Sequence, residues 1–373
     1  MPELADVFRL YGPEYVAKYR DRMLYSHLKV LRDVTRCRTD DLGGQVWFCQ
    51  NCNEYHYSYH SCKNRHCPKC QNDEATVWLE EQEQLLLPVP YFMATFTLPE
   101  ELRETARSNQ KVMYNLLFRT SAEALQTLAA DPKYVGGIMG MIGVLQTWTR
   151  DLAYHPHIHY LIPAGGLNEK QSTWLQARNK YLMPAKALSI IFRAKFRDAL
   201  KEKGLYENIP NTAWKKDWVV QIEPVGTGKA ALKYLAPYVF RVAISNRNIL
   251  ALREGNVTFR FRDPDTKKEK RQTFSAEEFI RRFLQHVLPR GFIKVRYYGF
   301  LATTKSELLK LVKELLHVRT SKKEKKSPHK PNEFTCPTCG KKMAFIKELP
   351  PKRGPPIRQP FRKNSFKISI VGA

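Results

Sequence analysis

The sequence predicts an α+β fold built around a mainly antiparallel sheet. Runs of strand character and amphipathic runs of helical character both occur, and they do not follow the strict strand–helix–strand alternation of a parallel sheet. Hydrophobic residues make up 43% of the 373 residues, which is enough to bury a core. A chain of this length holds roughly two or three domains of ~100–200 residues each.

Local patterns predict each element in order. Strands are predicted where aromatic and branched residues alternate or form short apolar runs: residues 91–98, 140–148, 157–163 and 218–223, with a hairpin of 257–262 and 270–274. Helices are predicted where apolar residues recur at helical spacing: residues 1–30, 71–87, 99–130, 185–203, 229–243 and 279–288. Pro88 and Pro90 end the second of these helices.

The net charge indicates a polyanionic partner. Lys and Arg number 62 and Asp and Glu number 36, so the formal net charge is +26. A surface this basic attracts nucleic acid, the usual polyanion of the cell, although a basic protein without such a partner is the alternative. No stretch approaches the ~18 consecutive apolar residues of a membrane span. The segment from Met1 to Asp6 has no secretory pattern, so we expect a cytoplasmic protein with no membrane partner.

The cysteines are clustered in a way that predicts zinc binding. Six of the eight lie between Cys37 and Cys70, and in a reducing cytosol such clusters bind metal more often than they form disulfides. Two CxxC pairs lie 14 residues apart, which predicts one structural zinc site formed by Cys49, Cys52, Cys67 and Cys70. A possible second site would use the remaining ligands of the segment, Cys37, His56, Cys62 and His66. The alternative for these histidines is a set of surface imidazoles.

Two further features accompany the cysteines. Lys63, Arg65 and Lys69 lie among the predicted ligands, so the zinc module would present cations to DNA. Cys336 and Cys339 form only half of a zinc site, and the spacing of His317 and His329 does not favour these residues as the missing ligands. An unoccupied or intermolecular cysteine pair is the alternative.

A histidine pair predicts a second kind of metal site. His157 and His159 lie two apart on a predicted strand, so both imidazoles project from the same face. Gln146, on the preceding strand, is the first candidate for a third ligand, and Asp151 and Glu223 are alternatives. Two histidines and an oxygen ligand with open positions suit a catalytic divalent ion such as Mg²⁺ or Mn²⁺. The alternative is a histidine pair hydrogen-bonded on a half-buried face.

A tyrosine pair supplies candidate nucleophiles. Tyr234 and Tyr238 lie at i and i+4, on one face of a predicted helix, and the cations Lys229, Lys233 and Arg241 flank them. Attack by a tyrosine oxygen on a metal-polarised phosphodiester would release a 3′-hydroxyl and leave a 5′-phosphotyrosine. Two tyrosines allow two such links and therefore strand transfer. The alternative is an amphipathic helix that uses tyrosine for packing.

These motifs together resemble a known family. His157-Ile158-His159 resembles the histidine–hydrophobic–histidine (HUH) motif of single-strand DNA endonucleases, and the tyrosine pair resembles their two-tyrosine nucleophile helix. The segment 61–71 resembles the N-terminal zinc-binding domain of rolling-circle insertion-sequence transposases, the IS-ninety-one (IS91) family. Further similar segments follow in the family's order: 96–99, 146–148, 241–246, 281–283 and 286–289. Two positions depart from it, Pro237 within the tyrosine helix and Gln146, where histidine is common.

The resemblance implies an HUH endonuclease fold, a central antiparallel sheet flanked by helices, together with a small zinc-binding domain. It implies a transposase that nicks and rejoins single-stranded DNA through 5′-phosphotyrosine intermediates, acting on transposon ends in the bacterial nucleoid. The expected cofactors are one or two structural Zn²⁺ ions and a catalytic Mg²⁺ or Mn²⁺. A plasmid or phage replication initiator, or a relaxase, would share this chemistry, and a non-catalytic zinc-finger nucleic-acid-binding protein is a different class.

The motifs also predict a division of the chain. Residues 1–88 form an N-terminal helix and zinc-binding domain, and residues 89–250 form the two-tyrosine catalytic domain. Residues 251–317 complete the transposase domain. Residues 318–373 form a basic linker, the CxxC knuckle of Cys336 and Cys339, and a basic tail that would contact phosphates without sequence preference.

Overall fold

The computed structural model describes residues 1–178, 180–240, 242–263, 265–318 and 334–352. Most of the predicted basic linker and tail, with His329, lies outside these residues. The protein is built from helices and antiparallel sheets, so the predicted α+β class is confirmed. No helix within the described residues combines the length and the apolar character needed to cross a membrane.

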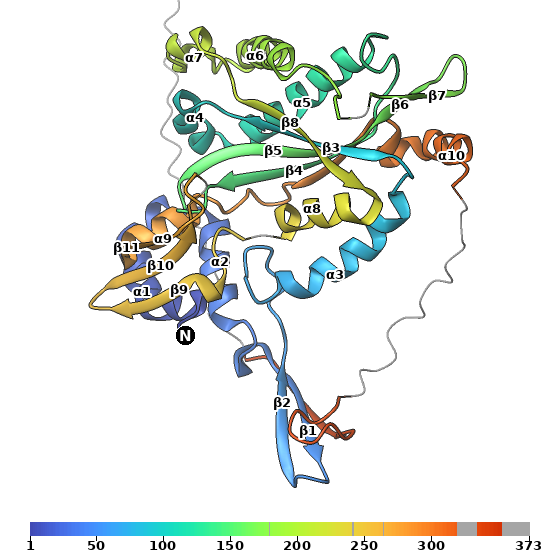
Figure 1. The fold of residues 1–373 in the computed structure, drawn as a ribbon. Coiled ribbons are helices and arrows are strands. Elements are labelled where there is room, and N and C mark those ends of the chain that lie inside the picture. The colour runs from blue at the N-terminus through green and yellow to red at the C-terminus, as the bar shows by residue number, and fades with distance from the viewer. Residues whose placement is uncertain (179, 241, 264, 319–333, 353–373) are drawn as a thin grey trace, which may run out of the picture.

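A five-stranded antiparallel sheet forms the centre of the main body (Figure 1). Its strands lie in the order β12 (Val295–Tyr298), β4 (Met141–Trp148), β5 (Tyr154–Pro163), β3 (Pro90–Thr97) and β8 (Val220–Thr227). All pairings are antiparallel, and nearly all residues of the central strands β4 and β5 are buried, because helices cover both faces of the sheet. β12 was not predicted, since its four residues carry too short a pattern.

Helices cover both faces of this sheet. On one side lie α4 (Arg103–Ser108), α5 (Gln110–Ala129), α6 (Ala185–Glu202) and α7 (Thr212–Lys215), and on the other lie α8 (Gly228–Phe240) and α3 (Gln71–Gln82) (Figure 1). The hairpin β6 (Gly165–Asn168) and β7 (Thr173–Gln176) and the helix α10 (Ser306–Leu315) lie at one end. The predicted helix 99–130 is divided at Asn109, whose φ of −126° and ψ of 42° are not helical.

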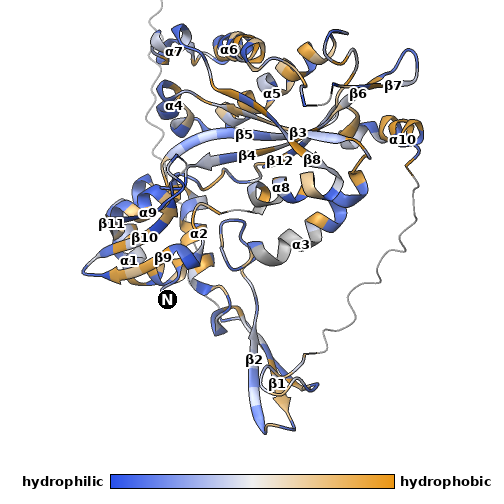
Figure 2. Cartoon of the chain, in the orientation of Figure 1, coloured by the Kyte–Doolittle hydropathy of each residue, from blue (hydrophilic) through white to orange (hydrophobic). Residues whose placement is uncertain are grey.

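The alternation of side chains along the strands builds two cores. On β3, Phe92 and Phe96 point towards α5 and α6, whereas Tyr91 and Met93 point towards α8. On β5, Tyr160 packs in the first core. The histidine positions on β5 therefore face the α8 side. Orange hydrophobic and blue hydrophilic segments alternate along the helices in Figure 2, as expected of amphipathic helices on such cores.

A second group of elements packs around a core of its own. The helices α1 (Leu4–Tyr19) and α2 (Tyr25–Arg36) pack with α9 (Ala276–Leu284) and a three-stranded sheet, whose strands are β9 (Ile249–Arg253), β10 (Asn256–Arg262) and β11 (Glu269–Ser275). Phe8 and Phe283 meet edge to face with ring centroids 5.3 Å apart. The predicted helix 1–30 is thus two helices, separated by a 3-10 turn at Arg20–Arg22.

A slender ribbon projects from the main body (Figure 1). Its strands β1 (Gly44–Cys49) and β2 (Glu54–Tyr59) form a hairpin, and β13 (Ala344–Leu349), from almost three hundred residues later, pairs with β1. The order of the strands is β13–β1–β2. The C-terminal CxxC segment therefore lies beside the N-terminal cysteines.

Candidate active site

Three polar side chains converge where β4 and β5 pair. The strand register places Gln146 opposite His157, and His159 lies two residues further along the same face of β5. The Gln146 Oε1 lies 3.1 Å from the His157 Nε2 and 3.2 Å from the His159 Nε2. All three residues are at most 9% exposed. The structure thus brings together the three residues that the sequence analysis selected as ligands of a divalent ion.

Both imidazoles have a polar contact at Nδ1 and turn Nε2 towards Gln146. The His157 Nδ1 donates to the carbonyl oxygen of His155 over 2.6 Å, which leaves its Nε2 without a proton in the neutral ring. The His159 Nδ1 lies 3.0 Å from the hydroxyl of Thr95. Burial lowers the pKa of His157 to about 4 and the pKa of His159 to about 2, so both rings are neutral at pH 7.

This donor set fits a divalent cation. Ligand atoms at about 2.1 Å from an octahedral cation lie about 3 Å apart when they are neighbours. The distances of 3.1 and 3.2 Å from the Gln146 oxygen to the two imidazole nitrogens match this spacing. The Gln146 oxygen and the unprotonated His157 Nε2 are two acceptors beside each other, an arrangement that a cation between them stabilises. Of the two alternative ligands, Asp151 accepts a hydrogen bond from Thr149 instead.

The histidines open onto a cavity of about 310 Å³. It lies between β3, β5, β8 and α8, and its lining consists of Met93, Thr95, Thr97, His155, His157, His159, Val219, Gln221, Glu223 and Tyr238. One tyrosine of the predicted pair and the second alternative ligand, Glu223, therefore belong to this cavity. Thr95, which also lines the cavity, could not be predicted as a site residue, because a threonine on a strand carries no distinctive signal.

The two tyrosines occupy different positions relative to the histidines. α8 runs from Gly228 to Phe240 without a break, so both lie on one helix, with ring centroids 6.2 Å apart. The Tyr238 ring packs on the His159 imidazole at a centroid distance of 3.9 Å. Tyr234 is 41% exposed, and its hydroxyl donates to the Glu223 Oε1 over 2.7 Å. This hydrogen bond, with burial as a second cause, raises the pKa of Tyr234.

A partly buried lysine contacts the end of the tyrosine helix. The Lys294 Nζ donates to the carbonyl oxygen of Val239, next to Tyr238, over 2.9 Å. The same ammonium lies 5.2 Å from the centre of the Trp148 ring. Burial lowers the pKa of Lys294 to about 7. The contact satisfies a carbonyl group of the last helical turn, which has no partner within the helix.

The predicted DNA-binding cations differ in their exposure and in their contacts within the chain. Lys63 and Lys233 are exposed. Three others make contacts within the chain: Lys69 with Glu3 at 2.6 Å, Lys229 with Glu83 at 2.8 Å, and Arg65 with the carbonyl oxygen of Phe292 at 2.6 Å. Arg241 lies outside the described residues.

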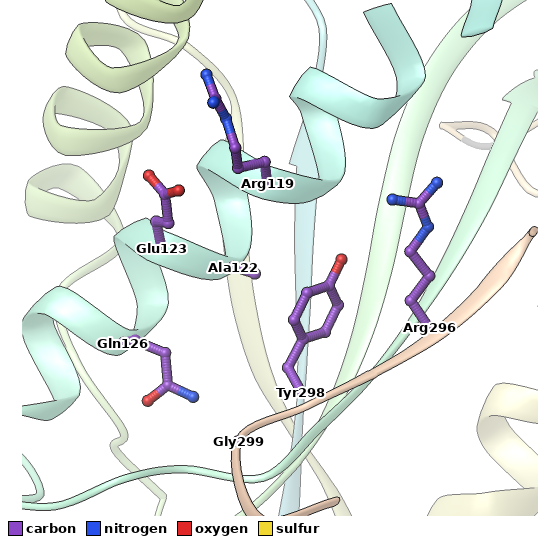
Figure 3. A pocket seen from close by; sticks show the side chains of 7 residues that line it. All are labelled: Arg119, Ala122, Glu123, Gln126, Arg296, Tyr298 and Gly299. Atoms are coloured by element: carbon purple, nitrogen blue, oxygen red, sulfur yellow. The ribbon is translucent and has the colours of Figure 1, made fainter. Parts of the chain in front are cut away.

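A second hollow, of about 340 Å³, lies on the opposite face of the sheet (Figure 3). Residues of α5 and β12 line it, among them Arg119, Gln126 and Arg296. Arg119 is paired with Glu202 at 2.8 Å, the Gln126 Nε2 donates to the Met139 carbonyl oxygen over 2.7 Å, and Arg296 donates to Asn115. Because each of these three side chains already has a partner outside the lining of the hollow, the hollow offers few unpaired polar groups to a ligand.

The thiols gather in two groups of four that differ from the predicted sets. One group is Cys37, Cys62, Cys67 and Cys70, and the other is Cys49, Cys52, Cys336 and Cys339. Within each group the ligand atoms all lie within 4.8 Å of one another. The predicted site of Cys49, Cys52, Cys67 and Cys70 is therefore wrong. Cys49 and Cys52 lie at the turn of the β1–β2 hairpin, at the far end of the ribbon. Cys67 and Cys70 instead pack in the core that contains α1 and α2.

The predicted mixed site of cysteines and histidines is also wrong. The His66 Nε2 accepts a hydrogen bond from the backbone nitrogen of Leu288 over 3.3 Å, so this side chain points into the main body. His56 lies in the ribbon, with its Nε2 3.6 Å from the Cys336 sulfur. The first group instead closes with four thiols, with sulfurs 3.5 Å apart between Cys37 and Cys70. Such a closed set of four suits structural zinc.

The comparisons with known proteins agree with these features. Residues 140–308 match a family model described as "Putative transposase", and residues 7–98 match one described as "Transposase zinc-binding domain". The chain is 38% identical over 320 residues to "Putative transposase y4qJ" of Sinorhizobium fredii, which covers 80% of each chain. It is 26% identical over 335 residues to the "Transposase for insertion sequence element IS801" of Pseudomonas savastanoi pv. phaseolicola, covering 83% of this chain and 80% of the relative. No solved structure matches.

The chain combines clustered cysteines in the region that matches the zinc-binding model with an antiparallel sheet in the region that matches the transposase model. It is therefore a DNA-processing enzyme of the transposase class. The chain belongs to the IS91 family of transposases and carries that family's N-terminal zinc-binding domain. The zinc-binding domain and the two thiol groups support structural zinc as a cofactor.

Proposed function

We propose that this transposase nicks and rejoins single-stranded DNA through 5′-phosphotyrosine intermediates in rolling-circle-type transposition, on the HUH endonuclease fold. The observation that carries the proposal is that His157 and His159 line one cavity with Tyr238, whose ring packs on His159, while the Gln146 oxygen lies behind them within 3.2 Å of both imidazoles. A metal-ligand set and a nucleophile in one cavity are what phosphodiester cleavage by a tyrosine requires. The relatives named as transposases favour transposition over plasmid or phage replication initiation, relaxase activity and non-catalytic binding.

The chain's own residues have separate tasks in this proposal. Gln146, His157 and His159 would hold Mg²⁺ or Mn²⁺, which supplies charge neutralisation and polarisation of the scissile phosphate when bound. Tyr238 attacks the phosphorus through its phenol oxygen and loses its proton to solvent or a base. The bond from phosphorus to the 3′-oxygen breaks, that oxygen takes up a proton, and the 5′-phosphate stays linked to the tyrosine. Tyr234 can cleave a second phosphodiester in the same way, which gives a second 5′-phosphotyrosine. Attack of a 3′-hydroxyl on either link forms a new phosphodiester, returns the proton to the released tyrosine and rejoins strands without ATP.

The cavity and the cations also suggest how the substrate binds. The lining residues Thr95 and Thr97 provide hydroxyl groups beside the histidines. Lys233 is exposed on the tyrosine helix and Lys63 on the zinc module, where each could contact a phosphate, as could Arg65, Lys69, Lys229 and Arg241. Such contacts position a strand without reading its sequence. We assign the recognition of element ends to the zinc module.

A covalent-adduct assay tests the proposal. The protein is incubated with labelled single-stranded DNA bearing an element end and with Mn²⁺ or Mg²⁺, and the denatured products are separated. A protein–DNA adduct and a free 3′-hydroxyl strand are expected, and both should disappear in the double variant Y234F/Y238F. The matched control is Y181F, since Tyr181 is exposed and lies outside the cavity. Nicking that persists in Y234F/Y238F would refute the assignment of the nucleophiles.

A further inference from the structure

The CxxC pair near the C-terminal end of the described chain meets the CxxC pair of the N-terminal hairpin. The Cys49 and Cys339 sulfurs are 3.6 Å apart, and the Cys336 and Cys52 sulfurs are 3.9 Å apart. A zinc ion at about 2.3 Å from four tetrahedral sulfurs sets an edge of about 3.8 Å between them. Cys336 and Cys339 lie beyond residues 7–98, the region that matches the zinc-binding family model.

The sulfur spacing also excludes a disulfide in this structure. A disulfide requires sulfurs about 2.05 Å apart, and all eight cysteines are free. The backbone at both pairs is folded as a tight turn around the sulfurs. The Gly340 nitrogen donates to the Cys336 carbonyl oxygen over 2.8 Å, with Gly340 at a φ of +72° that favours glycine. On the other side, the Cys52 nitrogen donates to the Cys49 sulfur over 3.4 Å, a contact that stabilises a thiolate.

The ribbon around these thiols has only a small hydrophobic core. Of the strand residues in the ribbon, only three are buried, namely Gly44, Val46 and Cys49, and most of β13 is exposed. The C-terminal segment adds one aromatic cluster, in which the Trp47 ring lies 4.6 Å from that of Phe334 and 5.4 Å from that of Phe345. So small a core does not stabilise a sheet by itself, and modules of this size depend on metal or disulfides.

We propose that Cys49, Cys52, Cys336 and Cys339 bind a second zinc ion, which fastens the C-terminal segment of this chain to its N-terminal ribbon. Zinc at this site holds β13 against β1 and completes the three-stranded sheet. His56, whose Nε2 lies 3.6 Å from the Cys336 sulfur, donates to the bound thiolate from outside the ligand set. The zinc module is thus discontinuous in sequence, and it is complete only when both ends of the chain are present.

Metal stoichiometry tests the site directly. Purified full-length protein is dialysed against metal-free buffer and its zinc is counted by mass spectrometry. Two zinc ions per chain are expected for the parent and for the knuckle control T338S, and one for C336S/C339S. The variant C62S/C67S, directed at the other group of thiols, should also lose one. Two zinc ions in C336S/C339S, or one in the parent, would overturn the proposal.

A second measurement covers the case in which C336S/C339S misfolds. A protease site is inserted between residues 319 and 333 of the otherwise unaltered chain, and the cut protein is passed over a sizing column. The C-terminal fragment should stay with the remainder in zinc buffer and separate after chelation, or when Cys49 and Cys52 are changed to serine. A fragment that separates while both zinc ions remain bound, or stays attached after complete zinc removal, would contradict the proposal.

Discussion

The Tyr234 hydroxyl donates a hydrogen bond to the Glu223 carboxylate over 2.7 Å, and this contact makes the two tyrosines of α8 unequal. Tyr238 instead packs on His159 and lines the histidine cavity. Tyr238 thus lies beside the candidate metal ligands, whereas Tyr234, one helical turn away, donates a hydrogen bond to a carboxylate. The asymmetry leads us to expect that Tyr238 attacks first and Tyr234 attacks second.

Single tyrosine substitutions should separate these two steps. Y238F should lower first-strand cleavage and adduct formation by at least about a hundredfold, because a nucleophile cannot be replaced by a neighbour in the wrong position. Y234F should leave first cleavage within about threefold and lower subsequent strand transfer by at least about tenfold. The measurement is single-turnover cleavage and transfer with labelled strands, and the peptide that carries the DNA is identified by mass spectrometry. An adduct on Tyr234 in the parent's first cleavage would reverse the order.

Neutralising Glu223 should alter only the second step. The hydrogen bond to the carboxylate raises the pKa of Tyr234, so E223Q should lower this pKa towards its ordinary value. The pH profile of strand transfer should then shift towards lower pH, while first cleavage by Tyr238 keeps its profile. The control is E169Q, because Glu169 is exposed and does not line the cavity. A profile that stays unchanged in E223Q would contradict the role of this contact.

Removing the Gln146 oxygen should weaken binding of the divalent ion. Q146A takes away the atom that lies 3.1 and 3.2 Å from the two imidazole nitrogens. We expect Mn²⁺ affinity to fall by about tenfold or more, and Q146E to restore or increase it, because a carboxylate is a stronger ligand than an amide. Mn²⁺ titration followed by electron paramagnetic resonance measures this without DNA. Equal affinity in Q146A and the parent would remove Gln146 from the ligand set.

Acid should destabilise the protein partly through His286. This side chain is 2% exposed, and burial lowers its pKa from 6.5 to about 4. Between these values the unfolded chain takes up a proton that the native state does not, so the free energy of unfolding falls as the pH falls. The contribution between pH 7 and pH 5 is about 2 kcal/mol. H286Q should lose this part of the pH dependence in chemical denaturation at the two pH values, whereas equal slopes in H286Q and the parent would refute it.

Much of the fold and part of the candidate site could be predicted because their signals are local. Alternation along one strand is enough to place His157 and His159 on a common face, and a spacing of four places Tyr234 and Tyr238 on one side of a helix. The position of Gln146 could be selected because consecutive strands of an antiparallel sheet tend to be neighbours.

Other features depend on which distant segments pack together. The strand and helix periodicities, the basic excess, the clustering of the thiols and the order of the family's motifs can all be read from the sequence. Which thiols share a site follows from the fold, because Cys49 and Cys336 meet through the pairing of β1 with β13 rather than through spacing. The fold likewise decided that Glu223 restrains Tyr234 and that Tyr238 faces His159. Such contacts arise from strand register and helix packing over long separations, which no local pattern encodes.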